Sequence, residues 1–469
     1  MRPALAPPFV ALVMMVLGCE GAAPTPSPYQ EIYAAGLTKY SGTAIVQPSS
    51  ITNEAPFPSV RVHHFTALSS ERGPLCMSGS EFYVETRDGS SSELLVFLEE
   101  GGLCLSEVCM ATADATLSLR ALMVSGFLGV GGVLSSMDRE NPLAEFNVVH
   151  VPSCDGAMFV GDVDRLLAVN GVKSMAYQRG LQNLTAAFEV AKSRYPNPSR
   201  LVLAGAGGGA YAMVLGLALA RHYYPGTEIA IISDSGGPIL RDHDKAFAGR
   251  ALAEVNALQY VPTSSCADCI ENGHFTKMFA WALDRDPNFR VAFMIHADDL
   301  ISADILMKSP PPIFRLALLR ELASLDGYGS RVHRFITVGR GHTYLFNVPM
   351  MDHLMDTAGD ALDGINSMAS ALDPAILLSI LSNPSTALDP KTLISLLSGP
   401  LSKALDPTTL LSFLSRAFDP KTILESLSGP LSKAELDEAG KPVTGYHWLE
   451  EFLRSPDTLV DVVNVMKAK

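Results

Sequence analysis

The first stretch that could carry chemistry is a run of glycines and alanines within residues 201–212, LVLAGAGGGAYA. An apolar run that enters a glycine-rich turn and continues into a small-residue helix is typical of the turns on which hydrolases present a nucleophile. This stretch contains no serine, cysteine or threonine, and Tyr211, its only hydroxyl, falls a turn into the predicted helix. The sequence therefore predicts the turn without the side chain that would attack a substrate.

The same glycines allow a second interpretation. Residues 205–210 fit the pattern GxGxxA of a dinucleotide-binding turn, and Asp234 ends the next apolar run at about the distance of a ribose-binding acid. The predicted place of the turn in the middle of a sheet and the export signal described below both argue against a nicotinamide cofactor. We therefore predict no cofactor.

Six apolar runs predict the buried strands that must position these residues. They are residues 93–100, 146–153, 200–205, 228–235, 289–298 and 333–339. Amphipathic segments between the runs predict helices, so the chain is expected to form an α/β fold with a mostly parallel sheet flanked by helices on both faces. Because ligands bind at the carboxyl ends of such strands, the residues just after each run are the candidates for chemistry.

The segments at these strand ends resemble the pectin acetylesterase and notum family of α/β-hydrolase-like serine esterases. The similar segments are LLVFLEEGGLC, NPLAEFNVVHVPSCDGAMFVGD, YQRGLQN, LVLAGAGGGAYA, HADDLIS and GRGHTYL, in that order. The resemblance covers roughly residues 70–348, and it resumes near GYHWLEEFLRSP. It implies an α/β-hydrolase-like fold and ester hydrolysis by a serine, an aspartate and a histidine in that chain order.

The resemblance also implies roles for individual residues. It places the acid at Asp298, with Asp299 as the alternative, and the base at His342 in GRGHT. Such a histidine accepts a hydroxyl proton only when a carboxylate orients it. The serine position falls on Gly207, which has no side chain to attack a carbonyl carbon.

The oxyanion loop departs from the family pattern as well. Glu100 stands at the first glycine of the family segment, and Leu103 stands at its tryptophan. The resemblance implies that the backbone N–H groups of Gly102 and Gly208 form the oxyanion hole. A carboxylate at Glu100 would oppose the negative charge that develops there. The resemblance therefore supports the scaffold more strongly than the activity.

Two functions follow from these residues. The first is a catalytically impaired esterase-like protein that acts by binding a ligand, such as an acylated carbohydrate or a small ester. The alternative is an active carboxylic-ester hydrolase that uses an atypical nucleophile or a water molecule activated by His342. Ser233 and Ser235 are candidate substitute nucleophiles, but SDSGGP resembles a structural turn of the family around Asp234.

Residues 351–440 form a different kind of sequence, in which four units begin with Asp-Pro. Aspartate as N-cap and proline at the first helical position predict short helices with one apolar stripe each. Helices of about ten residues are marginal alone, so they are expected to pack on each other, on the main domain or on a partner. The insertion is expected to be a loose cap, a lid over the site, or a surface for a lipid or another protein. A protein partner would bind the helices of residues 366–435. Residues 441–469 are expected to return to the main domain as C-terminal helices.

The N-terminus predicts export. Residues 1–19 have the charged, apolar and small-residue regions of a lipoprotein signal, with Cys19 as the lipidated residue. The alternative is an ordinary signal peptide. Residues 20–35 are expected to be a Pro-rich tether and residues 36–350 the esterase-like domain. Glu20, rather than aspartate, after Cys19 favours delivery to the outer membrane of the bacterial cell envelope, held by the lipid anchor alone.

Cysteine content and charge agree with that location. Six further cysteines suggest three disulfides, with Cys104–Cys109 and Cys266–Cys269 as plausible local pairs. A zinc site is the weaker alternative because CxxC occurs once and has no histidine partner motif, so no metal is predicted. The net charge of −14 argues against nucleic acid as a partner.

Overall fold

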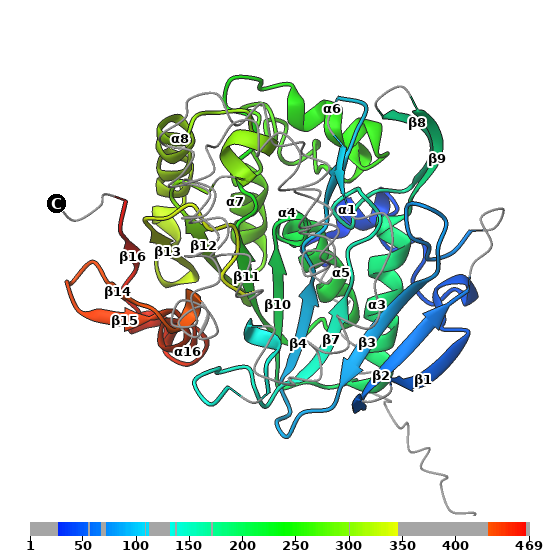
Figure 1. Ribbon diagram of the computed structural model, residues 1–469, viewed down its shortest axis with the longest axis horizontal. Coiled ribbons are helices and arrows are strands. Elements are labelled where there is room, and N and C mark those ends of the chain that lie inside the picture. Colours follow the sequence, from blue (N-terminus) through cyan, green and yellow to red (C-terminus); the bar gives the residue numbers. More distant parts are fainter. Residues whose placement is uncertain are drawn as a thin grey trace, which may run out of the picture.

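The computed structural model describes residues 27–54, 57–66, 72–107, 109–111, 132–136, 138–169, 172–299, 301–345 and 430–465. Within these residues the centre is a ten-stranded sheet of order β1-β2-β3-β7-β4-β10-β11-β12-β13-β16 (Figure 1). Neighbouring strands from β7 to β16 run parallel, whereas β1, β2, β3 and β7 pair antiparallel. The predicted mostly parallel sheet is therefore confirmed.

All six predicted strands are present. They are β4 (Leu94–Leu98), β7 (Asn147–Val151), β10 (Arg200–Ala206), β11 (Glu228–Asp234), β12 (Phe289–His296) and β13 (Val332–Thr337). Their side chains alternate between two apolar cores: in β4, Leu94 and Val96 belong to one core, and Leu95 and Phe97 to the other. These strands are continuous apolar runs because both faces of the sheet are covered.

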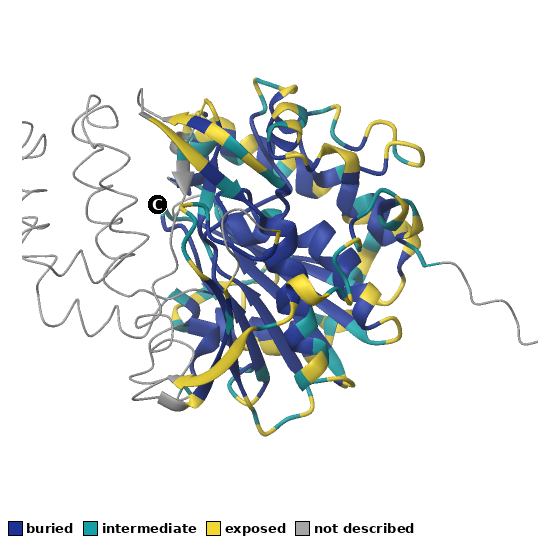
Figure 2. Ribbon diagram, turned by 90° about the vertical axis from the view of Figure 1, so that its right-hand side faces the viewer, coloured by how far each residue is buried: buried dark blue, intermediate teal, exposed yellow. Residues whose placement is uncertain are grey.

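The two cores lie on opposite faces of the sheet. One contains residues of α3 (Gly180–Arg194), α5 (Met213–Tyr223), α6 (Phe247–Glu254), α7 (Thr276–Arg285) and α8 (Pro311–Ala323). The other contains residues of α16 (Gly445–Arg454). Figure 2 shows the strands and the inner sides of the helices as the buried part of the protein. The predicted covering of both faces is confirmed.

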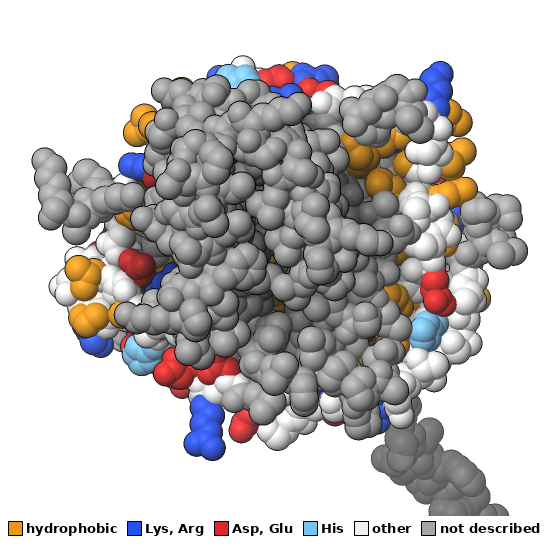
Figure 3. Space-filling view, viewed as in Figure 1, with side chains coloured by type: hydrophobic (Ala, Val, Ile, Leu, Met, Phe, Trp, Pro, Cys, Tyr) orange, Lys and Arg blue, Asp and Glu red, His pale blue; other side chains and the backbone are white. Residues whose placement is uncertain are grey.

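Several strands were not predicted. On one side of the six predicted strands the sheet continues with β3 (Phe82–Arg87), β2 (Phe57–Phe65) and the edge strand β1 (Ser50–Glu54), and on the other side it ends with β16 (Val462–Val463). Hairpins are formed by β5 (Gly102–Cys104) with β6 (Cys109–Ala111), β8 (Val163–Val169) with β9 (Val172–Gln178), and β14 (Ala434–Leu436) with β15 (Pro442–Thr444). The β8–β9 hairpin pairs Leu166 with Met175, and both side chains are exposed. Figure 3 shows hydrophobic side chains on the surface in the region of this hairpin.

Three disulfides join Cys76 to Cys154, Cys104 to Cys109, and Cys266 to Cys269. The two local pairs are those that the spacing suggested. In the part of the chain that the structure describes, no group of three histidines, cysteines or carboxylates is arranged to hold a metal ion. No helix in that part is both long and apolar enough to cross a bilayer.

The predicted tether ends earlier than residue 35. Helix α1 (Gln30–Ala34) packs on the main domain, with the Tyr29 ring fully buried and 5.8 Å from that of Trp281. The Tyr29 hydroxyl donates a hydrogen bond to Asp286 at 3.2 Å. The tether prediction was wrong for residues 29–35 because apolar side chains such as Ile32 supply a core-facing side that the Pro-rich composition before them lacks.

The C-terminal segment is a hairpin, a helix and a strand. Residues 430–440, which we placed in the repeat insertion, contain a 3-10 turn (Pro430–Ser432) and β14 of the last hairpin. After α16, β16 adds to the sheet beside β13, so residues 441–469 do not form helices alone. The remainder of the insertion, with its repeats, and the lipidation site at Cys19 lie outside the described residues.

We expect Tyr29→Ala to lower the free energy of unfolding by about 3 to 5 kcal/mol, the usual cost of emptying a large aromatic site. Tyr29→Phe removes one hydrogen bond to a charged group and should cost about 1.5 kcal/mol. Leu166→Ala, at a side chain that is 64% exposed, is the control and should stay within about 0.5 kcal/mol. Urea unfolding measures all three. Equal stability of Tyr29→Ala and wild type would show that α1 belongs to the tether.

Candidate functional site

The glycine turn keeps the backbone shape of a nucleophile turn. Strand β10 leads into Gly207, which has φ +47° and ψ −112°, and α4 (Gly208–Tyr211) follows at once. The amide of Gly207 donates a hydrogen bond to the Asp234 carbonyl at 2.9 Å. A Cβ atom at Gly209 would lie 2.3 Å from the Leu98 carbonyl oxygen, so that glycine is required by packing. The turn is preserved although the residue at its apex has no side chain.

His342 lies in the loop after β13 and is held by Asp299. Its Nδ1 is 2.9 Å from both carboxylate oxygens of Asp299, and both side chains are buried. Ser302 fixes the carboxylate in turn, through its amide at 3.0 Å and its hydroxyl at 2.8 Å. The structure therefore brings together the predicted histidine and the alternative aspartate.

Asp298, the first choice for the acid, is placed elsewhere. Its carboxylate accepts hydrogen bonds from Arg315 of α8, with Nη2 at 2.6 Å from Oδ2 and Nε at 3.1 Å from Oδ1. Asp298 and Asp299 are neighbours in the chain, and their side chains diverge to different partners. The assignment of the acid to Asp298 is corrected to Asp299 for this geometric reason.

Glu100 contacts the other ring nitrogen of His342, which sequence reasoning missed. Its Oε1 lies 2.9 Å from Nε2. A Cβ atom built at Gly207 would lie 2.8 Å from Cγ of Glu100 and 3.2 Å from His342 Nε2. The carboxylate thus occupies the space beside His342 that a serine at residue 207 would need. The sequence feature that could have indicated this contact is the pair of departures from the family pattern. Residue 100 is a large side chain where the family has glycine, and residue 207 is glycine where the family has serine.

The two carboxylates decide the protonation of His342. Burial alone lowers the pKa of His342, but the negative charges of Asp299 and Glu100 outweigh it and hold that pKa well above 6.5. At neutral pH both ring nitrogens therefore carry protons and donate, Nδ1–H to Asp299 and Nε2–H to Glu100. An imidazolium has no lone pair with which to accept a proton from serine or water.

Two titratable neighbours are neutral at the same pH. Burial raises the pKa of Asp234 to about 8, and its carboxyl accepts the amides of Tyr344 at 2.8 Å and Leu345 at 2.7 Å. Burial lowers the pKa of His296 to about 3. The cluster of Glu100, His342 and Asp299 therefore carries one net negative charge that these neighbours do not cancel.

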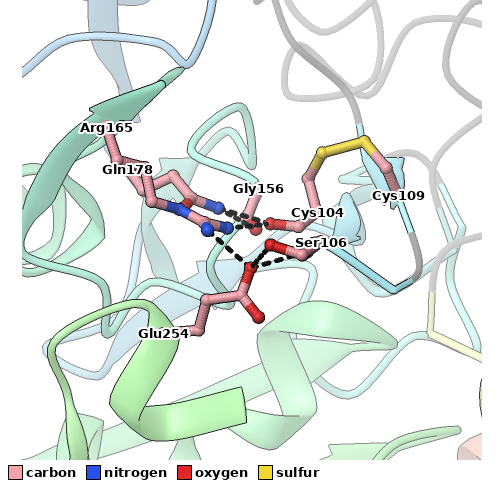
Figure 4. The surroundings of a disulfide bond; sticks show 7 residues. All are labelled: Cys104, Ser106, Cys109, Gly156, Arg165, Gln178 and Glu254. Atoms are coloured by element: carbon pink, nitrogen blue, oxygen red, sulfur yellow. Dashed lines mark hydrogen bonds and ion pairs between the residues drawn. A yellow bond between two sulfur atoms is a disulfide. The ribbon is translucent and has the colours of Figure 1, made fainter. Parts of the chain in front are cut away.

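The predicted oxyanion glycines lie side by side. Gly102 has φ +72°, and a Cβ atom at Gly208 would lie 3.0 Å from the Gly102 nitrogen. Figure 4 shows how the loop after Gly102 is anchored: the Cys104 carbonyl accepts from Gln178 at 2.7 Å and from Arg165 at 3.1 Å. The loop position is therefore fixed by the hairpin β8–β9. The role of the two amides in an oxyanion hole stays a prediction.

The other candidates occupy structural positions. The Ser233 hydroxyl donates to the Gly236 carbonyl at 3.3 Å, and the Ser235 hydroxyl donates to Asp234 at 3.0 Å, with all three side chains buried. Neither serine is placed on His342. Because the carboxyl of Asp234 is enclosed and bound to the chain following His342, it is not arranged to bind a ribose, and the dinucleotide interpretation loses its acid.

The contact of Glu100 with His342 predicts that the free energy of unfolding depends on pH. Because the pKa of His342 is raised in the folded protein, its contribution to the free energy of unfolding is complete below about pH 6.5 and is lost as the pH rises through the folded pKa. Glu100→Gln removes one of the two charges, so the pKa of His342 should fall, its contribution to the free energy of unfolding should be smaller, and the loss should be complete at a lower pH than in the wild type. Histidine ring NMR titration measures the pKa directly.

Asp298→Asn is the matched control for that titration. It removes a neighbouring carboxylate that is held by Arg315, and it should leave the pKa of His342 unchanged. An ordinary pKa for His342 in the wild-type protein would contradict the double ion pair.

Comparison with known proteins supports the scaffold. Residues 58–268 match the model of the pectinacetylesterase family, a segment that includes Glu100, Gly102 and Gly207 but ends before Asp299 and His342. No curated protein matches the chain. Over residues 58–268 the chain is therefore pectinacetylesterase-like, and it carries an esterase-like fold.

Proposed function

We propose that this protein is a pectinacetylesterase-like binding protein that has lost serine-based ester hydrolysis. The observation that carries the proposal is the 2.9 Å contact between Glu100 and Nε2 of His342, at the place where a nucleophile would stand. Gly207 supplies no nucleophile there, and the imidazolium supplies no base. Serine-based acyl transfer requires a nucleophile and a base, and both are missing at this place.

The electrostatics of the loop support the same conclusion. Hydrolysis of an ester places negative charge on the former carbonyl oxygen, which donors must stabilise. Glu100 is two residues from Gly102 and adds a carboxylate to that region. A protein that binds an intact ligand does not develop this charge, so a carboxylate there carries no penalty for binding.

We further propose that the protein is exported and lipid-anchored through Cys19, and that it binds an acylated carbohydrate or a small ester, or a protein partner through residues 366–435. Three disulfides support an oxidising compartment. Membrane association that persists in a Cys19→Ala variant would contradict the anchor, because the lipid would then be unnecessary.

A second candidate is an active ester hydrolase that works without serine. It is favoured by the partly exposed carboxylate of Glu100, which could itself accept a proton from water while the protonated His342 holds it in place. The two functions differ in one measurable respect: an active hydrolase would lose its turnover in Glu100→Gln and His342→Ala variants.

The test is a restoration experiment with the full-length protein and a small acetyl ester. Wild type should show no turnover above that of His342→Ala. Gly207→Ser alone should also be inactive, because its Cβ atom would lie 2.8 Å from Glu100 Cγ and the histidine would remain protonated.

The double variant Glu100→Gly with Gly207→Ser should hydrolyse the ester about 10² times faster than either single variant, since it restores the nucleophile and frees the base. Circular dichroism and thermal unfolding check that all variants fold. Wild-type turnover that disappears in His342→Ala would contradict the proposal and favour the second candidate.

A further inference from the structure

The disulfide between Cys266 and Cys269 lies in an exposed turn before α7. Cys266 is partly exposed, and the residues on both sides of it, 263–265 and 267–268, are exposed. Its partner Cys269 is fully buried in the apolar core. Exchange of a disulfide requires a thiolate to reach one of the two sulfur atoms. Cys266 is therefore the end of this bond that a thiol in solution can attack.

The other two disulfides provide comparisons. Cys76 and Cys154 are both fully buried, so a thiol does not reach their bond in the folded protein. Cys109 is partly buried and its partner Cys104 is almost fully buried. That bond closes the hairpin β5–β6, in another part of the chain, and it serves below as a control.

The two residues just before the disulfide hold helix α1. The Ser264 amide donates to one carboxylate oxygen of Glu31 at 2.8 Å, and the Ser265 hydroxyl donates to the other. The same hydroxyl accepts from Nε1 of Trp281 in α7 at 2.8 Å. The Trp281 ring packs against that of Tyr29, directly before α1. The turn therefore ties α1 to α7.

The disulfide in turn fixes the turn. Within it, the Cys266 amide donates to the Pro262 carbonyl at 2.8 Å, and the Cys269 amide donates to the Cys266 carbonyl at 3.1 Å. The sulfur bond joins this exposed segment to a cysteine that is anchored in the core. A crosslink restricts the open forms of the loop that it closes, so breaking it allows the two serines to leave Glu31.

The local charge permits a thiolate to approach. Asp268, an acidic residue between the two cysteines, forms an ion pair with Lys277 of α7. The ammonium group offsets the carboxylate, which reduces the repulsion that an anionic thiolate would meet at the turn.

We propose that the Cys266–Cys269 disulfide is a reducible site, and that its opening by an external dithiol releases helix α1 from the domain. A thiolate of the dithiol attacks Sγ of Cys266, the S–S bond breaks, and Cys269 leaves as a thiolate. The second thiolate of the dithiol then attacks the dithiol sulfur in this mixed disulfide, and Cys266 leaves. The two protons of the dithiol end on the cysteines, and the dithiol is oxidised to a disulfide by loss of two electrons.

This step does not depend on the proposed binding function. One consequence rests on the proposed lipid anchor: helix α1 follows the tether, so its release would add residues 29–37 to the chain between Cys19 and the domain. Nine extended residues span about 30 Å at most. Reduction would then set how far the domain reaches from the membrane.

The test exposes the full-length protein to increasing concentrations of dithiothreitol, a dithiol. Alkylation of the free thiols and peptide mapping identify the opened disulfides, and hydrogen–deuterium exchange reports on residues 29–37. Cys266 and Cys269 should be alkylated at a concentration that leaves Cys76 and Cys154 joined. Exchange of residues 29–37 should then be at least about tenfold faster, as expected for the loss of a stabilising crosslink.

Three variants separate the causes. Cys266→Ser with Cys269→Ser should show the fast exchange without dithiothreitol and no further increase with it. Cys104→Ser with Cys109→Ser is the matched control, which should keep the slow exchange and still respond to dithiothreitol. Glu31→Gln weakens the tie to the turn with the disulfide intact. Because coupling between two sites is reciprocal, it should speed exchange of α1 and shift Cys266 and Cys269 toward the reduced form.

Two results would overturn the inference. One is alkylation of Cys266 and Cys269 only at a concentration that also opens Cys76–Cys154 and unfolds the protein, as seen by circular dichroism. The other is selective reduction that leaves exchange of residues 29–37 unchanged. The wild-type titration decides the matter even where a serine variant does not fold. Ester hydrolysis by the wild type would contradict the proposed function and leave this result unaffected.

Discussion

One imidazole ring held between two carboxylates is the interaction on which the character of this site depends. Asp299 and Glu100 each lie 2.9 Å from one ring nitrogen of His342, and together they hold its pKa well above the usual value in spite of burial. A histidine between one carboxylate and one hydroxyl is a base. The same histidine between two carboxylates is a fixed cation that donates to both.

The sheet makes this meeting possible. Glu100 follows β4, Asp299 follows β12 and His342 follows β13, so three residues far apart in the sequence reach one edge of a parallel sheet. The elbow between β10 and α4 approaches from the middle of the same edge. Gly209 of this elbow is required by packing, since a Cβ atom there would lie 2.3 Å from the Leu98 carbonyl oxygen. The shape of the turn therefore does not depend on a nucleophile.

The two departures from the family pattern, glycine at residue 207 and glutamate at residue 100, fit each other sterically. Glycine at residue 207 leaves a space, and the side chain of Glu100 extends into it. A serine returned to residue 207 without a change at residue 100 would meet the Cγ atom of that glutamate. The same arrangement of Gly207 and Glu100 therefore leaves the site without a nucleophile and keeps His342 protonated.

The sequence predicted much of this fold and only part of the site. The six central strands were readable because burial on both faces makes them continuous apolar runs. The antiparallel strands β2 and β3 were missed because they carry His63 and Glu85 among their apolar residues. The choice between Asp298 and Asp299 required side-chain directions, and the contact of Glu100 with His342 required knowing which strand ends meet.

The most direct measurement of the central claim is the rate of acetyl ester hydrolysis by the wild-type protein beside His342→Ala under identical conditions. The account predicts equal rates at the level of the uncatalysed reaction, because a protonated His342 without a nucleophile contributes nothing. A wild-type rate well above that of His342→Ala would contradict it and show that the ring does act as a base.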